Sequence, residues 1–249
     1  MGYAVALAGW FLVARLVRWL WPARTEATFD RPWLEFGIAV VGGLAVLGVG
    51  QLWSAGFRVP DTGPLGPLGG AVNQLLIFAP LVLVPVYRRQ SWRTAWLAGR
   101  HMGFRIGVGV ALAGLALTAY AAVRADAGVP WEIAARLLSF ENLDEAVQVL
   151  LEDIIIAIVF VRLAAAIGGR AAVGVVAALF AAGHIPAMLS TGASPEELLL
   201  LLRDVALGVA VISVLRRSQD ILWFWPIHFT LDMLQFGAIT FGAAGSLAT

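Results

Sequence analysis

The chain has 249 residues, of which 60% are hydrophobic and only 13% are charged, and its formal net charge is +1. A soluble domain carries about a quarter charged residues, so this chain has too few charges to cover a water-facing surface. The near-neutral balance gives no reason to expect nucleic acid as a partner. The chain has no cysteine, which excludes disulfides and thiol chemistry. Together these features predict a protein embedded in a lipid bilayer.

Apolar runs recur along the whole chain, and each is long enough to cross about 30 Å of hydrocarbon. No water reaches the backbone in that layer, so the runs must be helices that satisfy their own hydrogen bonds. The sequence therefore predicts an all-α fold: one integral membrane domain over 1–249, a polytopic bundle of about eight transmembrane helices. The predicted spans are 3–21, 33–53, 71–87, 103–123, 144–167, 171–189, 196–215 and 221–241.

Three connecting segments have a recognisable character. Residues 55–70 contain three prolines and several glycines, which predicts a loop without helix. Residues 125–143 mix apolar and charged side chains, which indicates a short helix in the membrane interface, and residues 91–100 suggest another.

The placement of arginine predicts the orientation of the spans. All seventeen basic residues are arginine, and thirteen of them lie in or beside the first, third, fifth and seventh connections. By the positive-inside rule these connections are cytoplasmic. An even number of spans then leaves both termini outside.

Ionisable residues interrupt the last four predicted spans, whereas the first four are almost free of them away from their ends. A charge at the bilayer centre costs at least about 2.5–3.5 kcal/mol on insertion scales, so such residues usually face a cavity, a partner or a pathway. We therefore expect them to converge on one site. They are Glu152, Asp153, His184, Arg203, Asp204, His228 and Asp232.

Helical spacing groups some of these residues. Glu145, Gln148 and Glu152 share one face of the fifth span, and His228 lies one turn from Asp232 in the eighth. A carboxylate beside an imidazole is a pair that general acid–base catalysis uses. A histidine in a membrane helix also serves as an interhelical hydrogen-bonding residue, and that reading stays open for each one.

Arg203 has a structural interpretation as well. Ser194, Pro195 and Glu197 have the pattern of an N-cap, a first-turn proline and the reciprocal acid of a capping box. Arg203 then lies early in a well-marked helix, where we expect an ion-pair partner rather than a catalyst.

Three motifs in the last four spans resemble those of the CAAX prenyl protease and bacteriocin-processing family, also called CPBP or Abi. That family carries Glu-Glu-x-x-x-Arg, Phe-x-x-x-His and His-x-x-x-Asn/Asp motifs on separate membrane helices, in that order. The resemblance covers 144–241, which we expect to form the motif-bearing core. The matching residues are Glu152 and Asp153 for the first motif, Phe180 and His184 for the second, and His228 and Asp232 for the third.

The first motif departs from the family pattern. Its second acid is Asp153, one methylene shorter than glutamate, and Ala157 stands in the place of the arginine. Arg162 comes five residues later on a different face of the helix and cannot simply substitute. Arg203 is a candidate to supply the missing charge from the seventh span.

The resemblance implies an intramembrane endopeptidase that acts on a peptide or membrane-protein substrate in a prokaryotic cell membrane. In such an enzyme Glu152, assisted by His184, activates a water that attacks the peptide carbonyl. His228 donates a hydrogen bond to the oxyanion, and Asp232 orients His228. Asp153, Phe180 and Arg203 have supporting roles. No cofactor is expected, although an older view of the family places a metal there, which could be zinc held by Glu152, His184 and His228.

Other functions stay open. The altered first motif is compatible with a catalytically impaired relative that acts as a membrane scaffold, immunity or binding protein. A cytochrome with His184 and His228 as haem ligands leaves Glu152 and Asp153 unexplained. A transporter predicts inverted repeats, which the sequence does not show. The retained acid and imidazoles favour proteolysis.

Overall fold

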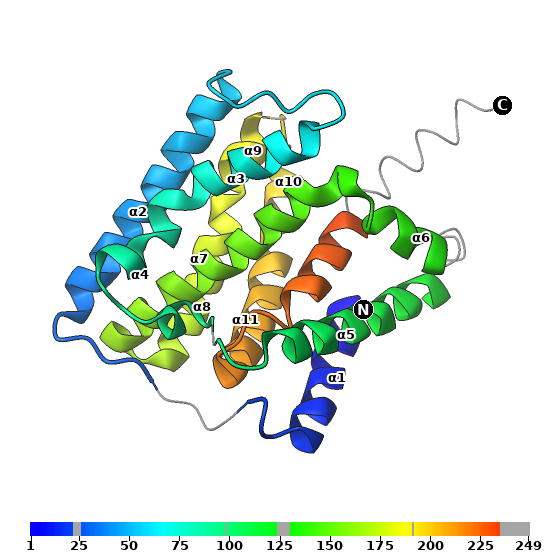
Figure 1. Ribbon diagram of the computed structural model, residues 1–249. Helices are drawn as coiled ribbons and strands as arrows, with labels where there is room; N and C mark the ends of the chain where they lie inside the picture. Colours follow the sequence, from blue (N-terminus) through cyan, green and yellow to red (C-terminus); the bar gives the residue numbers. More distant parts are fainter. Residues whose placement is uncertain (22–25, 98, 124–129, 191, 235–249) are drawn as a thin grey trace.

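The computed structural model of the protein describes residues 1–21, 26–97, 99–123, 130–190 and 192–234 (Figure 1). Within these ranges all regular structure is helical and no strand is present. The predicted all-α class is therefore confirmed.

Among the described residues, three helical segments are long and apolar enough to cross a membrane. They are α2 (Pro32–Ser54), α5 (Met102–Val123) and Pro195–Ser218, which α10 (Pro195–Leu199) and α11 (Leu201–Ser218) form together. Three shorter helices are also apolar: α1 (Gly2–Leu16), α3 (Gly66–Val82) and α8 (Gly169–Gly183). These helices are what an integral membrane protein requires, and the count of about eight spans stays a prediction.

The centre of the bundle is α7 (Leu143–Ile167), which packs against α2, α3 and α8 (Figure 1). Its 25 residues span about 37 Å. Val149, Asp153 and Ala157 are fully buried on it, at the four-residue spacing that keeps side chains on one helix face. α7 ends at Ile167, its C-cap Gly168 has a φ of +83°, which favours glycine, and α8 starts directly after it.

The last helix, over 225–234, packs between α1 and α7. The indole of Trp225 donates a hydrogen bond to the Ala146 carbonyl on α7, at 2.8 Å. A Cβ atom built on Gly2 of α1 would lie only 2.5 Å from Leu231 Cδ2, so the missing side chain at Gly2 allows close approach. The predicted span 221–241 extends to 241, and its part after 234 lies outside the described residues.

Several predicted boundaries shift. The loop expected over 55–70 is wrong at its end, because α3 begins at Gly66 and Pro67 fits in its first turn. The single span expected over 171–189 is divided, since α8 stops at Gly183 and the short α9 (Ile185–Ser190) follows His184. Pro186, which lacks a backbone N–H, lies in the first turn of α9 and cannot continue the hydrogen bonding of α8.

Three short elements occupy the predicted connecting segments. Residues 125–143 hold α6 (Pro130–Leu137) and a 3₁₀ turn, η2 (Phe140–Asn142), and residues 124–129 lie outside the description. The connection 91–100 holds η1 (Trp92–Ala95), whereas α4 (Val84–Tyr87) lies in the predicted span 71–87, which is divided because α3 ends at Val82. The capping box is confirmed, because Ser194 Oγ accepts from the Glu197 N–H at 3.3 Å and the Ser194 N–H donates to Glu197 Oε2 at 2.6 Å.

A buried ionic cluster joins three helix ends around Glu35, at the start of α2. Its carboxylate accepts hydrogen bonds from Arg88 Nη2 at 2.7 Å and from the Gln90 amide at 2.8 Å. The guanidinium of Arg162, near the end of α7, is fully buried, lies 3.8 Å from Glu35 Oε2 and also donates to Gln90. Glu35 is therefore the carboxylate that balances the charge of Arg162.

A second cluster surrounds Asp220, between α11 and the last helix. Its buried carboxylate accepts a hydrogen bond from the Trp21 indole at 2.9 Å and lies 3.5 Å from Arg105 Nε. Burial raises the pKa of the Asp220 carboxyl, and the neighbouring Arg105 opposes that shift. The two clusters join the connections predicted to be rich in arginine at one end of the bundle.

The Glu35 cluster yields a stability prediction. Replacing Glu35 with alanine leaves the Arg162 guanidinium buried without its carboxylate, and breaking a buried pair in this way costs about 3–5 kcal/mol. The matched control is Glu26→Ala, which removes a carboxylate that is 73% exposed and pairs with Arg216. That change should cost less than about 1 kcal/mol. Unfolding followed in detergent measures both, and equal losses would contradict the assignment.

Candidate functional site

The best-defined polar contact inside the bundle joins α7 to the last helix. His228 Nδ1 lies 2.9 Å from Asp153 Oδ1, and both side chains are buried. A carboxylate oxygen accepts, so Nδ1 carries the proton and Nε2 is left as the nitrogen for proton transfer. Asp153 thus fixes both the orientation and the tautomer of His228, as the acid of a hydrolase triad does.

Two aromatic rings hold the His228 imidazole in place. The Phe224 ring centroid lies 5.4 Å from that of His228, and the Tyr3 ring centroid lies at 6.5 Å. Tyr3 also interacts electrostatically with Asp232, Asp153 and Glu152. The first turn of α1 therefore contributes a phenol to the cluster. Sequence reasoning missed Tyr3, because an aromatic residue at the end of an apolar helix is usual at a membrane interface.

Glu152 lies on a different face of α7 from Asp153, and its side chain is only partly buried. The Gln148 amide donates a hydrogen bond to Glu152 Oε1 at 3.0 Å, which confirms that these two residues share a face. Glu152 interacts electrostatically with His228, Asp232 and His184. Ionisable groups from three helical segments thus lie close enough to Glu152 to interact with its charge. A cavity that all of them line stays a prediction.

His184 lies at the C-cap of α8 and is exposed. Its Nδ1 donates to the Phe180 carbonyl at 2.9 Å, and its ring meets the Phe180 ring edge-on at a centroid distance of 4.9 Å. The Phe-x-x-x-His spacing therefore places His184 in contact with Phe180 one helical turn away. This hydrogen bond uses Nδ1 and does not involve Nε2. Direct assistance of Glu152 by His184 stays a prediction.

The structure changes the expected roles of three residues. The predicted orienting partner of His228 was Asp232, but Asp153 makes the hydrogen bond. Arg203 does not supply the missing charge, because its side chain is 73% exposed and pairs with Asp204 at 3.6 Å. Its interpretation as an ion-pair partner is confirmed.

No arginine of this chain takes the place of the arginine in the first family motif. Ala157 is fully buried, and its methyl group supplies no charge at this position. Arg162 belongs to the Glu35 cluster towards the other end of α7. Neither Arg162 nor Arg203 replaces the arginine of the family motif.

One oxygen of the central pair has no protein partner. Asp153 Oδ2 is buried and accepts no hydrogen bond from any described residue. Buried carboxylate oxygens are normally satisfied by protein groups or ordered water, so this oxygen can accept from a water or a substrate N–H. The described residues contain no group of three His, Asp or Glu side chains placed to hold a metal ion, and the zinc alternative stays untested.

Comparison with known proteins adds no relative: no protein-family model, no curated protein and no solved structure matches the chain. The resemblance described above therefore depends on the three motifs alone.

A double-mutant cycle tests the assignment of Asp153. The changes Asp153→Asn and His228→Gln, made singly and together, should show a coupling of about 0.5–3 kcal/mol in the free energy of unfolding, because the residues are in contact. The parallel cycle with Asp232→Asn and His228→Gln should give a smaller coupling. A larger coupling for Asp232 would return the orienting role to that residue.

Proposed function

We propose that the protein is an intramembrane endopeptidase of the CPBP type, in which Glu152 activates a water for attack on a peptide bond. The observation that supports this most is the buried hydrogen bond between His228 and Asp153 beside Glu152. It joins the first and third motifs of the family across two helices. Holding a carboxylate and an imidazole inside an apolar bundle is costly, and proton transfer gives a reason for it.

In the proposed chemistry Glu152 acts first as a base and then as an acid, and His228 stabilises the oxyanion. Glu152, held by Gln148, takes a proton from water as the water oxygen bonds to the peptide carbonyl carbon. The protonated His228 donates from Nε2 to the developing oxyanion, and the Asp153 carboxylate stabilises the imidazolium. Glu152 then gives its proton to the leaving amine as the C–N bond breaks. No covalent enzyme intermediate and no cofactor are required.

The unpartnered oxygen of Asp153 supports a hydrated site. An empty apolar cavity stays dry, whereas a water needs two or more polar partners. Asp153 Oδ2 and the Glu152 carboxylate offer two acceptors on consecutive residues of α7. Water drawn to them is the nucleophile that the reaction needs.

A second candidate function is a catalytically impaired relative that acts as a membrane scaffold, immunity or binding protein. Ala157 favours it, because the fully buried methyl group removes the charge that the family places beside its acids. In that case the His228–Asp153 pair would hold α7 and the last helix together without doing chemistry.

The proposal includes a multi-pass topology of about eight spans in a prokaryotic cell membrane, with both termini outside. It is supported by the contacts that tie the arginine-rich connections together at one end of the bundle. Positive charge gathers on the cytoplasmic side of membrane proteins. Glu152 then lies in the outer half of the bilayer.

Replacing Glu152 with glutamine tests the catalytic role. The amide cannot take a proton, so hydrolysis of membrane-spanning peptides reconstituted with the protein in vesicles should fall by about 10²–10⁴-fold. Glu141→Gln, the same change at an exposed residue of η2, should leave the rate unchanged. Unfolding in detergent confirms that both variants are folded.

The scaffold alternative has its own outcome in this experiment. If Glu152→Gln and His228→Ala both fold, behave as wild type and still bind the same membrane partner, the protein is a binding module on a protease-like fold.

The topology is tested with single cysteines, since the natural chain has none. Gly99→Cys lies in an arginine-rich connection with open space around it, and Thr62→Cys lies in the exposed loop before α3. An impermeant thiol reagent added to whole cells should label position 62 and not position 99. The reverse pattern would overturn the orientation.

A further inference from the structure

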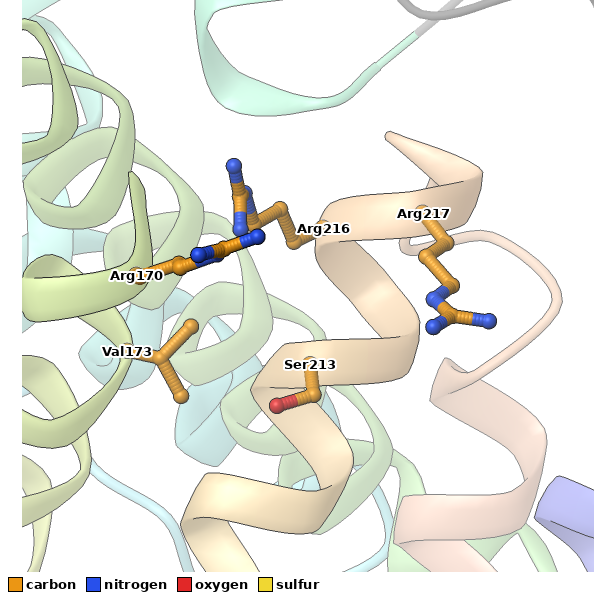
Figure 2. A pocket seen from close by; sticks show the side chains of 5 residues that line it. All are labelled: Arg170, Val173, Ser213, Arg216 and Arg217. Atoms are coloured by element: carbon orange, nitrogen blue, oxygen red, sulfur yellow. The ribbon is translucent and has the colours of Figure 1, made fainter. Parts of the chain in front are cut away.

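A hollow of about 300 Å³ lies between the start of α8 and the end of α11. It is at the lower end of the size range of small-molecule sites. Figure 2 shows Arg170 from α8 and Arg216 from α11 extending toward one another across it. The hollow lies at the opposite end of α8 from His184, so it is separate from the Glu152 cluster. Its lining residues are Arg170, Val173, Ser213, Arg216 and Arg217.

Positive charge around this hollow exceeds the negative charge that the described residues supply. Arg216 pairs with Glu26 at 3.3 Å, but the Glu26 side chain is 73% exposed. Arg217 lies over the Phe11 ring, 5.5 Å from its centroid, and within the part of the chain that the structure describes neither Arg217 nor Arg170 forms an ion pair. Figure 2 shows the Arg217 side chain turned away from the other two arginines, so Arg170 and Arg216 have one exposed carboxylate, Glu26, between them.

The start of α8 adds to this positive potential. No side chain caps it, and its first turn contains no acidic residue. The guanidinium of Arg216 lies against this helix end, because a Cβ atom built on Gly169 would be 2.5 Å from Arg216 Nε. A cation is unfavourable at a helix N-terminus, where unpaired N–H groups and the helix dipole favour an anion. The absence of a side chain at Gly169 is what allows the guanidinium to lie there.

We infer that this hollow binds a phosphate group, with Arg170 and Arg216 as its ligands. Guanidinium groups bind phosphate oxygens through paired, charge-assisted hydrogen bonds, and the two arginines approach from opposite walls. The bound anion offsets the repulsion between the arginines and the wrong-signed contact at the start of α8. Ser213 lines the hollow without charge, and its hydroxyl donates a hydrogen bond to the Val209 carbonyl at 2.6 Å.

Two sources can supply such a phosphate: the diester headgroup of an anionic lipid and a free phosphate anion. The arginine-rich end of the bundle is where the headgroups of an anionic leaflet would meet the protein. Phosphate binding here does not depend on the proposed hydrolysis.

The experiment measures binding of fluorescent phosphatidylglycerol to the purified protein in detergent, with phosphatidylcholine bearing the same label as the neutral comparison. Arg170→Gln with Arg216→Gln should weaken phosphatidylglycerol binding by about tenfold or more, because each lost charge-assisted hydrogen bond is worth about that much. The matched control is Arg58→Gln with Arg203→Gln, which removes the same charge from two exposed arginines elsewhere. It should change binding by less than about twofold.

Inorganic phosphate then distinguishes the two sources. Displacement of the labelled lipid by inorganic phosphate identifies a free phosphate anion as the ligand, and resistance to displacement identifies the headgroup. Equal weakening in both double variants, or none in either, would overturn the site. Should the double variant lose its unfolding transition, Arg170→Gln alone carries the same comparison, since that side chain is exposed and forms no ion pair with a described residue.

Discussion

A charge inside this apolar bundle must find a partner, and that constraint organises the structure. Two polar layers cross α7. At one, Asp153 meets His228, and at the other, about 13 Å further along the helix, Arg162 meets Glu35. Removing one member of a buried pair costs more than a surface pair ever contributes. Each layer therefore fixes which helices surround α7 and at what height.

The two polar layers differ in how well their buried charged groups are paired. The Glu35 layer joins helix ends, and its buried nitrogen without a hydrogen bond, Arg162 Nε, lies 3.8 Å from the Glu35 carboxylate. The Asp153 layer leaves one carboxylate oxygen without a protein donor and keeps Glu152 partly exposed beside it. Arg162 Nε thus faces an opposite charge, whereas no described group donates to Asp153 Oδ2. We interpret the unfilled acceptor as the place where water enters, and this difference separates the proposed active site from the structural layer.

Sequence reasoning succeeded where the information is local. Long apolar runs gave α2, α5 and α7 within one residue of their ends, and the pattern at Ser194 gave a capping box that the structure contains. It failed where the outcome depends on packing between helices. One-turn spacing suggested Asp232 as the partner of His228, but the orientation of the last helix against α7 selects Asp153. Helical spacing within one segment carries no information on that choice.

The same limit explains the other differences. Tyr3 lies beside His228 where α1 approaches the last helix closely at Gly2 and Leu231, a contact between distant parts of the chain. Glu35 lies in the first turn of a helix, where an acid needs no special explanation, until Arg162 from α7 is placed beside it.

The central claim is that water reaches the acid–imidazole cluster. An experimental structure in lipid, at a resolution that shows ordered water, tests it most directly. We expect a water hydrogen-bonded to Asp153 Oδ2 and within reach of the Glu152 carboxylate and a histidine nitrogen. Apolar side chains packed against Asp153 Oδ2, with no water beside Glu152, would contradict the account.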